Sequence, residues 1–153
     1  MLKLTWIEFF LRLIPETFIL ICGIHVISRK SFDIPKYIFS SIVMAILSFF
    51  IRWLPIYFGV HMIINIILSI SIMVIINIPV IKAIYSTLLM FFILSLSEFL
   101  NMIALSLLNI NIESLSTFLK CLVGVPSLIM MLLFIIAINW VLKRKEGVKD
   151  VIN

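Results

Sequence analysis

Five apolar segments follow one another along this 153-residue chain, each long enough to form a helix that crosses a membrane. A bilayer core about 30 Å thick needs roughly 20 helical residues. The expected spans are residues 6–27, 34–54, 57–78, 79–108 and 118–142. Strands of a membrane barrel would instead alternate apolar and polar residues over about ten positions. The sequence therefore predicts an all-α, polytopic membrane helix bundle with five transmembrane helices.

The composition excludes a soluble globular domain. The chain is 64% hydrophobic and 12% charged, whereas soluble domains are about 45–50% apolar and about 25% charged. A soluble fold of this size would leave large apolar areas in water, and disordered chains are poor in such residues. We expect one transmembrane domain over residues 1–142, surrounded by the lipid bilayer, and a short basic tail over residues 143–153.

Positive charges are divided unevenly between the two ends of the spans. One set of ends carries eight of them: Arg29, Lys30, Lys36, Lys82, Lys143, Arg144, Lys145 and Lys149. The other set carries four: Lys3, Arg12, Arg52 and Lys120. The positive-inside rule predicts an outside N-terminus and a cytoplasmic C-terminus. Topology accounts for the net charge of +5, so no nucleic-acid partner is expected. As an alternative to crossing the membrane, residues 3–13 lie flat on its outer surface, and the first crossing begins near Leu13.

Polar side chains inside the spans concentrate toward the predicted outer side. They form three stripes with helical spacing: Glu8–Arg12–Glu16, His61–Asn65–Ser69 and Ser95–Glu98–Asn101. A charge in the membrane costs roughly 2.5–3.5 kcal/mol on insertion scales. Glu98 therefore has either a structural partner, Arg12 or His61, or a ligand or ion. For the other two stripes the alternative to a site is ion pairing within the first helix and hydrogen bonding between helices.

The stripes predict an outward-facing polar cavity between the first, third and fourth spans. The candidate ligand or cavity residues are Arg12, Glu16, His61, Asn65, Glu98 and Asn101. Cys22 and His25 lie three residues apart, and a Cys–His pair can form a thiol nucleophile, but no third orienting residue is evident. The sequence has neither a glycine-rich phosphate loop nor an HExxH motif. We therefore expect no catalytic residue, metal or cofactor, and an intramembrane Cys peptidase is only a minor alternative.

Three short runs resemble segments of known membrane proteins: Ile-Pro-Glu-Thr-Phe at 14–18, Ile-Arg-Trp-Leu-Pro-Ile-Tyr-Phe-Gly-Val-His at 51–61, and Gly-Val-Pro-Ser-Leu at 124–128. They resemble small multi-pass membrane proteins of clostridia, and the chain is similar over nearly its whole length to the membrane sensor region of Gram-positive peptide-sensing histidine kinases. The sequence departs from those kinases because no kinase module follows. The resemblance implies a sensor-like module and implicates Glu16, Arg52, Pro55, Gly59 and His61.

Two classes of function fit these features. The first is a sensor-like or regulatory membrane subunit that binds an extracellular peptide or small ligand and acts through a membrane or cytoplasmic protein partner. The second is a small transporter, or a substrate-binding membrane subunit, with Glu98 as an ion or proton site. An oligomer is compatible with either class.

Overall fold

The computed structural model describes residues 9–29, 33–54, 58–108 and 117–152, and these residues are helical apart from the short connections between helices. The elements in chain order are the π-helix η1 (Phe9–Leu13), α2 (Ile14–Ser28), α3 (Ile34–Trp53), α4 (Phe58–Ile75), α5 (Val80–Leu107) and α6 (Thr117–Ile152). Because η1 runs directly into α2, they act as one helix of 20 residues. The described part of the chain thus contains five helices in the predicted order.

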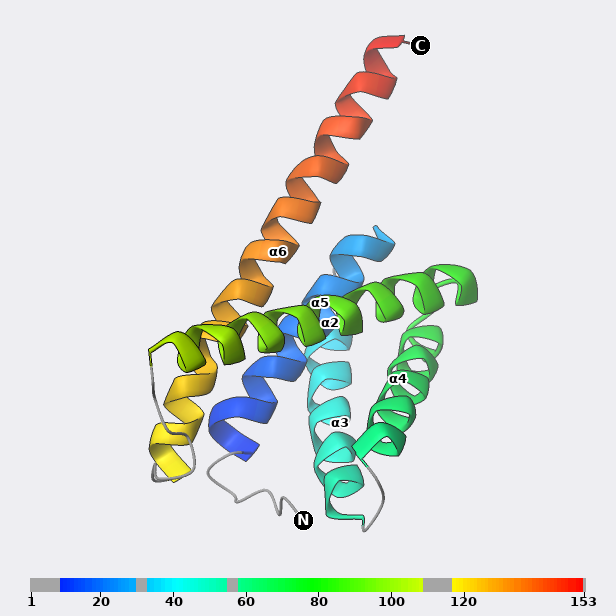
Figure 1. Ribbon diagram of the computed structural model, residues 1–153. Coiled ribbons are helices and arrows are strands. Elements are labelled where there is room, and N and C mark those ends of the chain that lie inside the picture. Colours follow the sequence, from blue (N-terminus) through cyan, green and yellow to red (C-terminus); the bar gives the residue numbers. More distant parts are fainter. Residues whose placement is uncertain (1–8, 30–32, 55–57, 109–116, 153) are drawn as a thin grey trace.

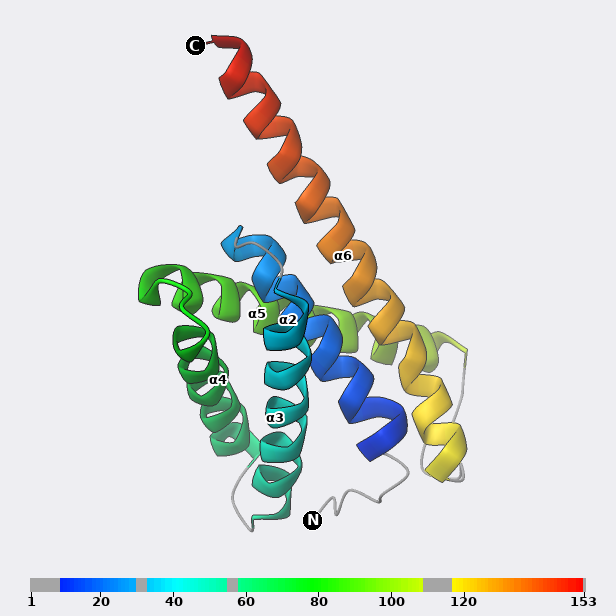
Figure 2. The same cartoon turned by 180° about the vertical axis from the view of Figure 1, so that it is seen from behind.

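The helices form a bundle around α2 (Figure 1). Helix α2 contacts α3, α5 and α6, while α4 packs between α3 and α5. Helices α2, α3 and α4 run alternately up and down, and α5 crosses the direction of α3 and α4 obliquely (Figures 1 and 2). Helix α6 packs along α2 and α5 and then continues alone past the bundle, so residues 143–152 extend this helix.

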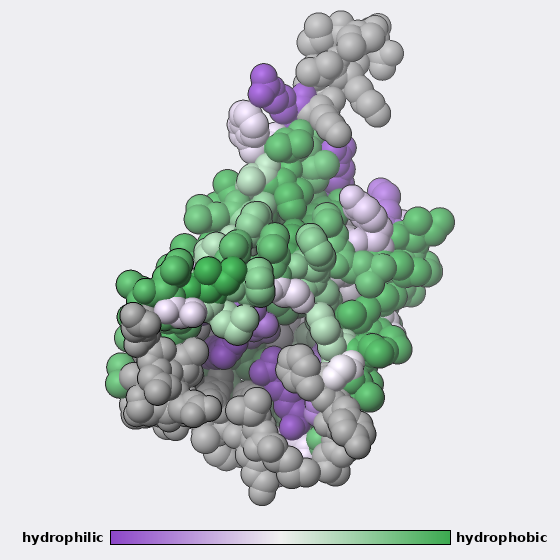
Figure 3. Space-filling view, viewed as in Figure 1, coloured by the Kyte–Doolittle hydropathy of each residue, from purple (hydrophilic) through white to green (hydrophobic). Residues whose placement is uncertain are grey.

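The surface of the bundle matches the apolar environment that the sequence predicts. Four helices are long and apolar enough to cross a membrane: Phe9–Ser28, Ile34–Trp53, Val80–Leu107 and Leu122–Arg144. A shorter apolar helix, Gly59–Ile75, occupies the place of the third predicted span. Figure 3 shows a broad hydrophobic belt, with hydrophilic side chains above it and in a recess below. The all-α, multi-pass character is confirmed, whereas the orientation in the membrane stays a prediction.

Helix α4 ends three residues before the predicted boundary, and its end has a local cause. Asn77 adopts a left-handed conformation with φ of 66°. Its N–H donates to the carbonyl of Val74, and the N–H of Ile78 donates to the carbonyl of Met73. These two bonds form a Schellman motif, in which Asn can replace the usual Gly. The next residue, Pro79, has no N–H to continue the helix, so the chain turns there into α5.

Close packing at the centre of the bundle depends on Gly23 of α2. A Cβ at this position would overlap Sδ and Cε of Met90 on α5 and would lie 3.0 Å from Cδ1 of Ile135 on α6. Met90 is 0% exposed and Ile135 is also buried. Because glycine has no side chain, α2 can approach both neighbouring helices at this level. This contact holds α2, α5 and α6 together beneath the polar end of the bundle.

Candidate functional site

A π-helix carries the first charged side chain of the site. Pro15 lacks the N–H that would donate to the carbonyl of Leu11, and its ring would clash with that carbonyl in a regular α-helix. The chain widens into η1 directly before this proline. Such one-turn π segments are frequent at functional sites. Here the π-helix places Arg12 toward α5 and α6.

Four charged side chains from three parts of the bundle form an alternating chain, which we call the charged cluster: Arg52, Glu16, Arg12 and Glu98. Nη2 of Arg12 donates to Oε1 of Glu98 at 3.0 Å. Nε of Arg12 lies 4.0 Å from Oε2 of Glu16, and Nη2 of Arg52 lies 3.9 Å from Oε1 of Glu16. Only the first distance is that of a strong, charge-assisted hydrogen bond. The cluster therefore joins η1, α2, α3 and α5 through one tight and two loose ion pairs.

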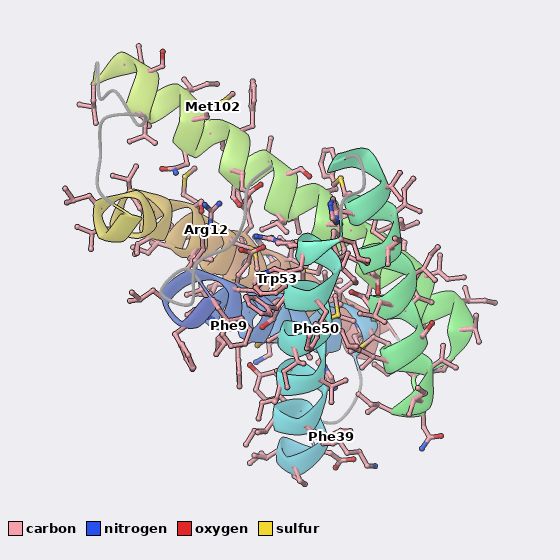
Figure 4. The ribbon with its side chains drawn as sticks, turned by 90° about the horizontal axis from the view of Figure 1, so that it is seen from below. Phe9, Arg12, Phe39, Phe50, Trp53 and Met102 are labelled. Atoms are coloured by element: carbon pink, nitrogen blue, oxygen red, sulfur yellow. The ribbon has the colours of Figure 1, made fainter. Side chains whose placement is uncertain are left out.

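Exposure differs sharply within the charged cluster. The side chain of Glu16 is 7% exposed, whereas those of Arg12, Glu98 and Arg52 are 39%, 43% and 34% exposed. Glu16 thus forms the buried base of the cluster, and the other three side chains reach its surface. Viewed from this end, Arg12 lies between η1, α5 and α6, with Trp53 at the end of α3 nearby (Figure 4). We call this the cluster end of the bundle.

Helix α6 closes one side of the charged cluster. Nε, Cδ and Cζ of Arg12 lie 3.6–3.7 Å from the position that a Cβ of Gly124 would occupy. Nδ2 of Asn101 on α5 donates to the backbone carbonyl of Val123 at 3.1 Å. This carbonyl lies in the turn before Pro126, which is inside the helix. Glu98 and Asn101 share a face of α5 as predicted, but one contacts η1 and the other α6.

The polar stripe of α4 contributes mainly to helix packing. Oγ of Ser48 on α3 donates to Oδ1 of Asn65 at 2.9 Å, and Oγ of Ser69 donates to the Asn65 carbonyl. Nδ1 of His61 is buried and has no hydrogen-bond partner among the described residues. Asn65 therefore links α3 to α4, while the ring of His61 is left with an unused polar atom.

The structure brings Arg12, Glu16 and Glu98 together, and it adds Arg52, which the sequence had suggested only as the outer end of its span and through the resemblance. Glu8 lies outside the described residues. The signal for Arg52 was its position on the predicted outer side, where the opposite charges of the first span also lie. The cluster is thus built by the first, second and fourth predicted spans.

Cys22 and His25 do not form an evident nucleophile. Nδ1 of His25 lies 2.9 Å from the carbonyl of Ile21, and the ring packs edge-on against Tyr37. Cys22 is a half-buried free thiol. Within the described ranges no group of three or more His, Cys, Asp or Glu side chains could hold a metal ion. The peptidase alternative stays a prediction.

No family model, curated protein or solved structure matches this chain. The resemblance to peptide-sensing kinases therefore stays a prediction from the three short runs.

Proposed function

We propose that this chain is a sensor-like or regulatory membrane subunit that recognises a polar ligand at the charged cluster and acts through a protein partner. The observation that carries the proposal is the position of α6. Near its beginning this helix packs against Arg12 at Gly124. Its last part extends past the opposite end of the bundle as far as Ile152 (Figure 1). A change around Arg12 therefore has a direct mechanical route to a segment that a partner can contact.

A second contact between α2 and α6 supports the same route. Nη2 of Arg29, the left-handed residue that ends α2, donates to the backbone carbonyl of Leu142 at 3.3 Å. The guanidinium of Arg144, in the next turn of α6, lies 5.3 Å from the ring centroid of Trp140. Helices α2 and α6 are thus joined at both ends, which favours their moving as a unit. Coupling between distant sites can be carried by packed, rigid elements of this kind.

Photo-crosslinking in native membranes tests the proposal. A photoreactive residue at Trp140 or Val141, both exposed near the end of the apolar part of α6, should give a discrete adduct with another protein. The Glu98→Gln variant should change the adduct yield, because it breaks the ion pair that joins α5 to Arg12. Ile67, equally exposed on α4, is the matched control position. A regulatory role would be refuted if adducts form only with lipid, or if the adduct yield is the same in the Glu98→Gln variant.

A transport role is the second candidate, and the burial of Glu16 favours it. A carboxylate inside a membrane protein frequently marks an ion or proton path, and Glu16 and Glu98 lie on either side of Arg12. Glu98 remains the proposed ion or proton site, although its Oε1 already accepts a bond from Arg12. Glu98→Gln should abolish pH-dependent uptake into vesicles if this role holds. Unchanged flux would eliminate it.

A further inference from the structure

We propose that the ligand of the charged cluster is a small soluble zwitterion, with one carboxylate and one primary ammonium group: a short peptide with free ends, which is long enough to reach past Glu16 and Arg12 to both ends of the cluster. The carboxylate would bind Arg52, and the ammonium would bind Glu98. This inference rests on the proposed recognition role of the same site, and it adds the chemical class of the ligand. Three features carry it: the two open ends of the charged chain, the unpaired nitrogen of His61, and the charge balance.

The first open end is the guanidinium of Arg52. It has five N–H donors in a planar fork that matches a carboxylate. Its Nη2 lies 3.9 Å from Glu16, which exceeds the usual hydrogen-bond distance of about 2.7–3.2 Å. The side chain is 34% exposed, and no hydrogen bond from it is found within the described residues. Arg52 is therefore available for a two-point interaction with an incoming carboxylate.

The second open end is the carboxylate of Glu98. Oε1 accepts the hydrogen bond from Arg12 at 3.0 Å. Oε2 makes no hydrogen bond to any part of the chain that the structure describes, and the side chain is 43% exposed. A carboxylate oxygen can only accept. A primary ammonium group, with three donors, is the complementary ligand group.

The register of the α3–α4 pair places His61 beside the first open end. Ser48 and Asn65 are in direct contact at 2.9 Å. Arg52 lies one turn after Ser48, and His61 lies one turn before Asn65, so both occupy the same level of these antiparallel helices. The buried Nδ1 of His61 has no partner among described residues. A ligand carboxylate or its neighbouring amide would supply the hydrogen bond that this position lacks.

The charge balance of the four described side chains favours a zwitterion over a simple ion. Two arginines and two glutamates give the charged cluster a formal charge of zero. A ligand with a single charge would match one open end and leave the other without a partner of opposite charge. A zwitterion keeps the sum at zero and also satisfies both open ends. Neutral ligands would leave the donors of Arg52 and the acceptor of Glu98 without matching charges.

Retention of defined peptide pools by the full chain tests this inference. The protein is placed in nanodiscs of phosphatidylcholine and phosphatidylglycerol and dialysed against four pools. The pools are free amino acids, random tripeptides with free ends, the same tripeptides N-acetylated, and the same tripeptides C-amidated. Mass spectrometry measures the bound fraction. We expect the tripeptides with free ends to be retained at least about tenfold over their two blocked forms, since each lost charged hydrogen bond weakens binding by about tenfold to a hundredfold.

Two variants assign the ends of the ligand. Arg52→Gln should remove the preference for a free carboxylate, and Glu98→Gln should remove the preference for a free amine. Lys36→Gln is the control, because Lys36 pairs with Asp33 at the opposite end, and it should bind like the unmodified protein. Circular dichroism and size-exclusion chromatography check that each variant is folded. The comparison of free with blocked peptide pools uses the unmodified protein and does not depend on the variants. Equal retention of blocked and free pools, or retention of none, overturns the inference.

The crosslinking experiment separates this inference from the proposed function. Partner adducts with no zwitterion retained would overturn the ligand class alone. A retained zwitterion without partner adducts would overturn the regulatory role and leave the ligand class standing.

Discussion

Replacing Gly23 with alanine should weaken the bundle, although the same change in most helices strengthens it. In a helix interior, alanine is favoured over glycine by about 1 kcal/mol. At Gly23 the added methyl group would overlap the end of Met90 and press on Ile135. Met90 is a flexible residue, but it is 0% exposed and belongs to the hydrophobic core, so a shift of its end has to be accommodated by neighbouring core side chains. Overpacking of this kind costs about 1–3 kcal/mol, so the net loss should be between about 0 and 2 kcal/mol.

Gly59 provides the matched control. It lies exposed in the first turn of α4, and a Cβ there would meet nothing within 4 Å. Gly59→Ala should therefore be neutral or stabilising by up to about 1 kcal/mol. Because a glycine in the first turn gains no more from alanine than one in the helix interior, the difference between the two variants is a lower limit for the cost of the contact with Met90. That difference should be between about 0 and 3 kcal/mol in the free energy of unfolding.

Reversible unfolding in mixed micelles of dodecylmaltoside and SDS, followed by circular dichroism, measures this difference. A third variant checks the cause: in a Met90→Ala background, Gly23→Ala should become favourable, because the overlapping side chain is gone. If Gly23→Ala stabilises the protein more than Gly59→Ala does, or has the same effect with and without Met90→Ala within about 0.5 kcal/mol, which is the usual limit of additivity, the close packing of α2 against α5 is wrong.

Three other contacts can be tested in the same unfolding assay. A double-mutant cycle on Arg12→Gln and Glu98→Gln should give a coupling of about 0.5–3 kcal/mol, and zero coupling would contradict their 3.0 Å bond. Asn101→Ala should cost about 1 kcal/mol by removing the donor to the α6 backbone; Asn101→Asp, which cannot donate, should cost at least as much. Ser48→Ala should cost about 0.6 kcal/mol, with no further loss when Asn65→Ala is added.

The sequence predicted the helices well because their causes are local. Ile34 and Pro35 begin the second span in a row of apolar residues, and α3 begins at Ile34 as expected. The third span was predicted three residues too long at its C-terminal end. Its last residues, Ile76 and Ile78, are as apolar as the helix itself. The left-handed Asn77 that ends it is visible only as a backbone conformation.

The partners of the polar residues were harder to predict, because they depend on which helices are neighbours. The sequence offered Arg12 and His61 as alternative partners of Glu98, and periodicity cannot choose between them. The structure selects Arg12 because η1 and α5 meet at that level. The side-chain amide of Asn101 donates to the backbone carbonyl of Val123. Because every residue has a backbone carbonyl, the pattern of side chains cannot predict which one accepts. The polar stripes therefore predicted which end of the bundle is polar, whereas the packing of the helices determined which polar residues contact one another.

The unequal lengths of α4 and α5 have a consequence for the surrounding lipid. Eighteen residues make α4 about 27 Å long and 28 residues make α5 about 42 Å long, at 1.5 Å per residue. A hydrocarbon core of about 30 Å is thicker than the first helix and thinner than the second. The oblique path of α5 shortens its projection along the membrane normal, but α4, packed beside it, has no such adjustment. If α4 also crosses the membrane, as the sequence predicts, local thinning of the bilayer would accommodate it at a cost of fractions of a kcal/mol per Å. We therefore expect an asymmetric lipid annulus and the highest stability in thin membranes.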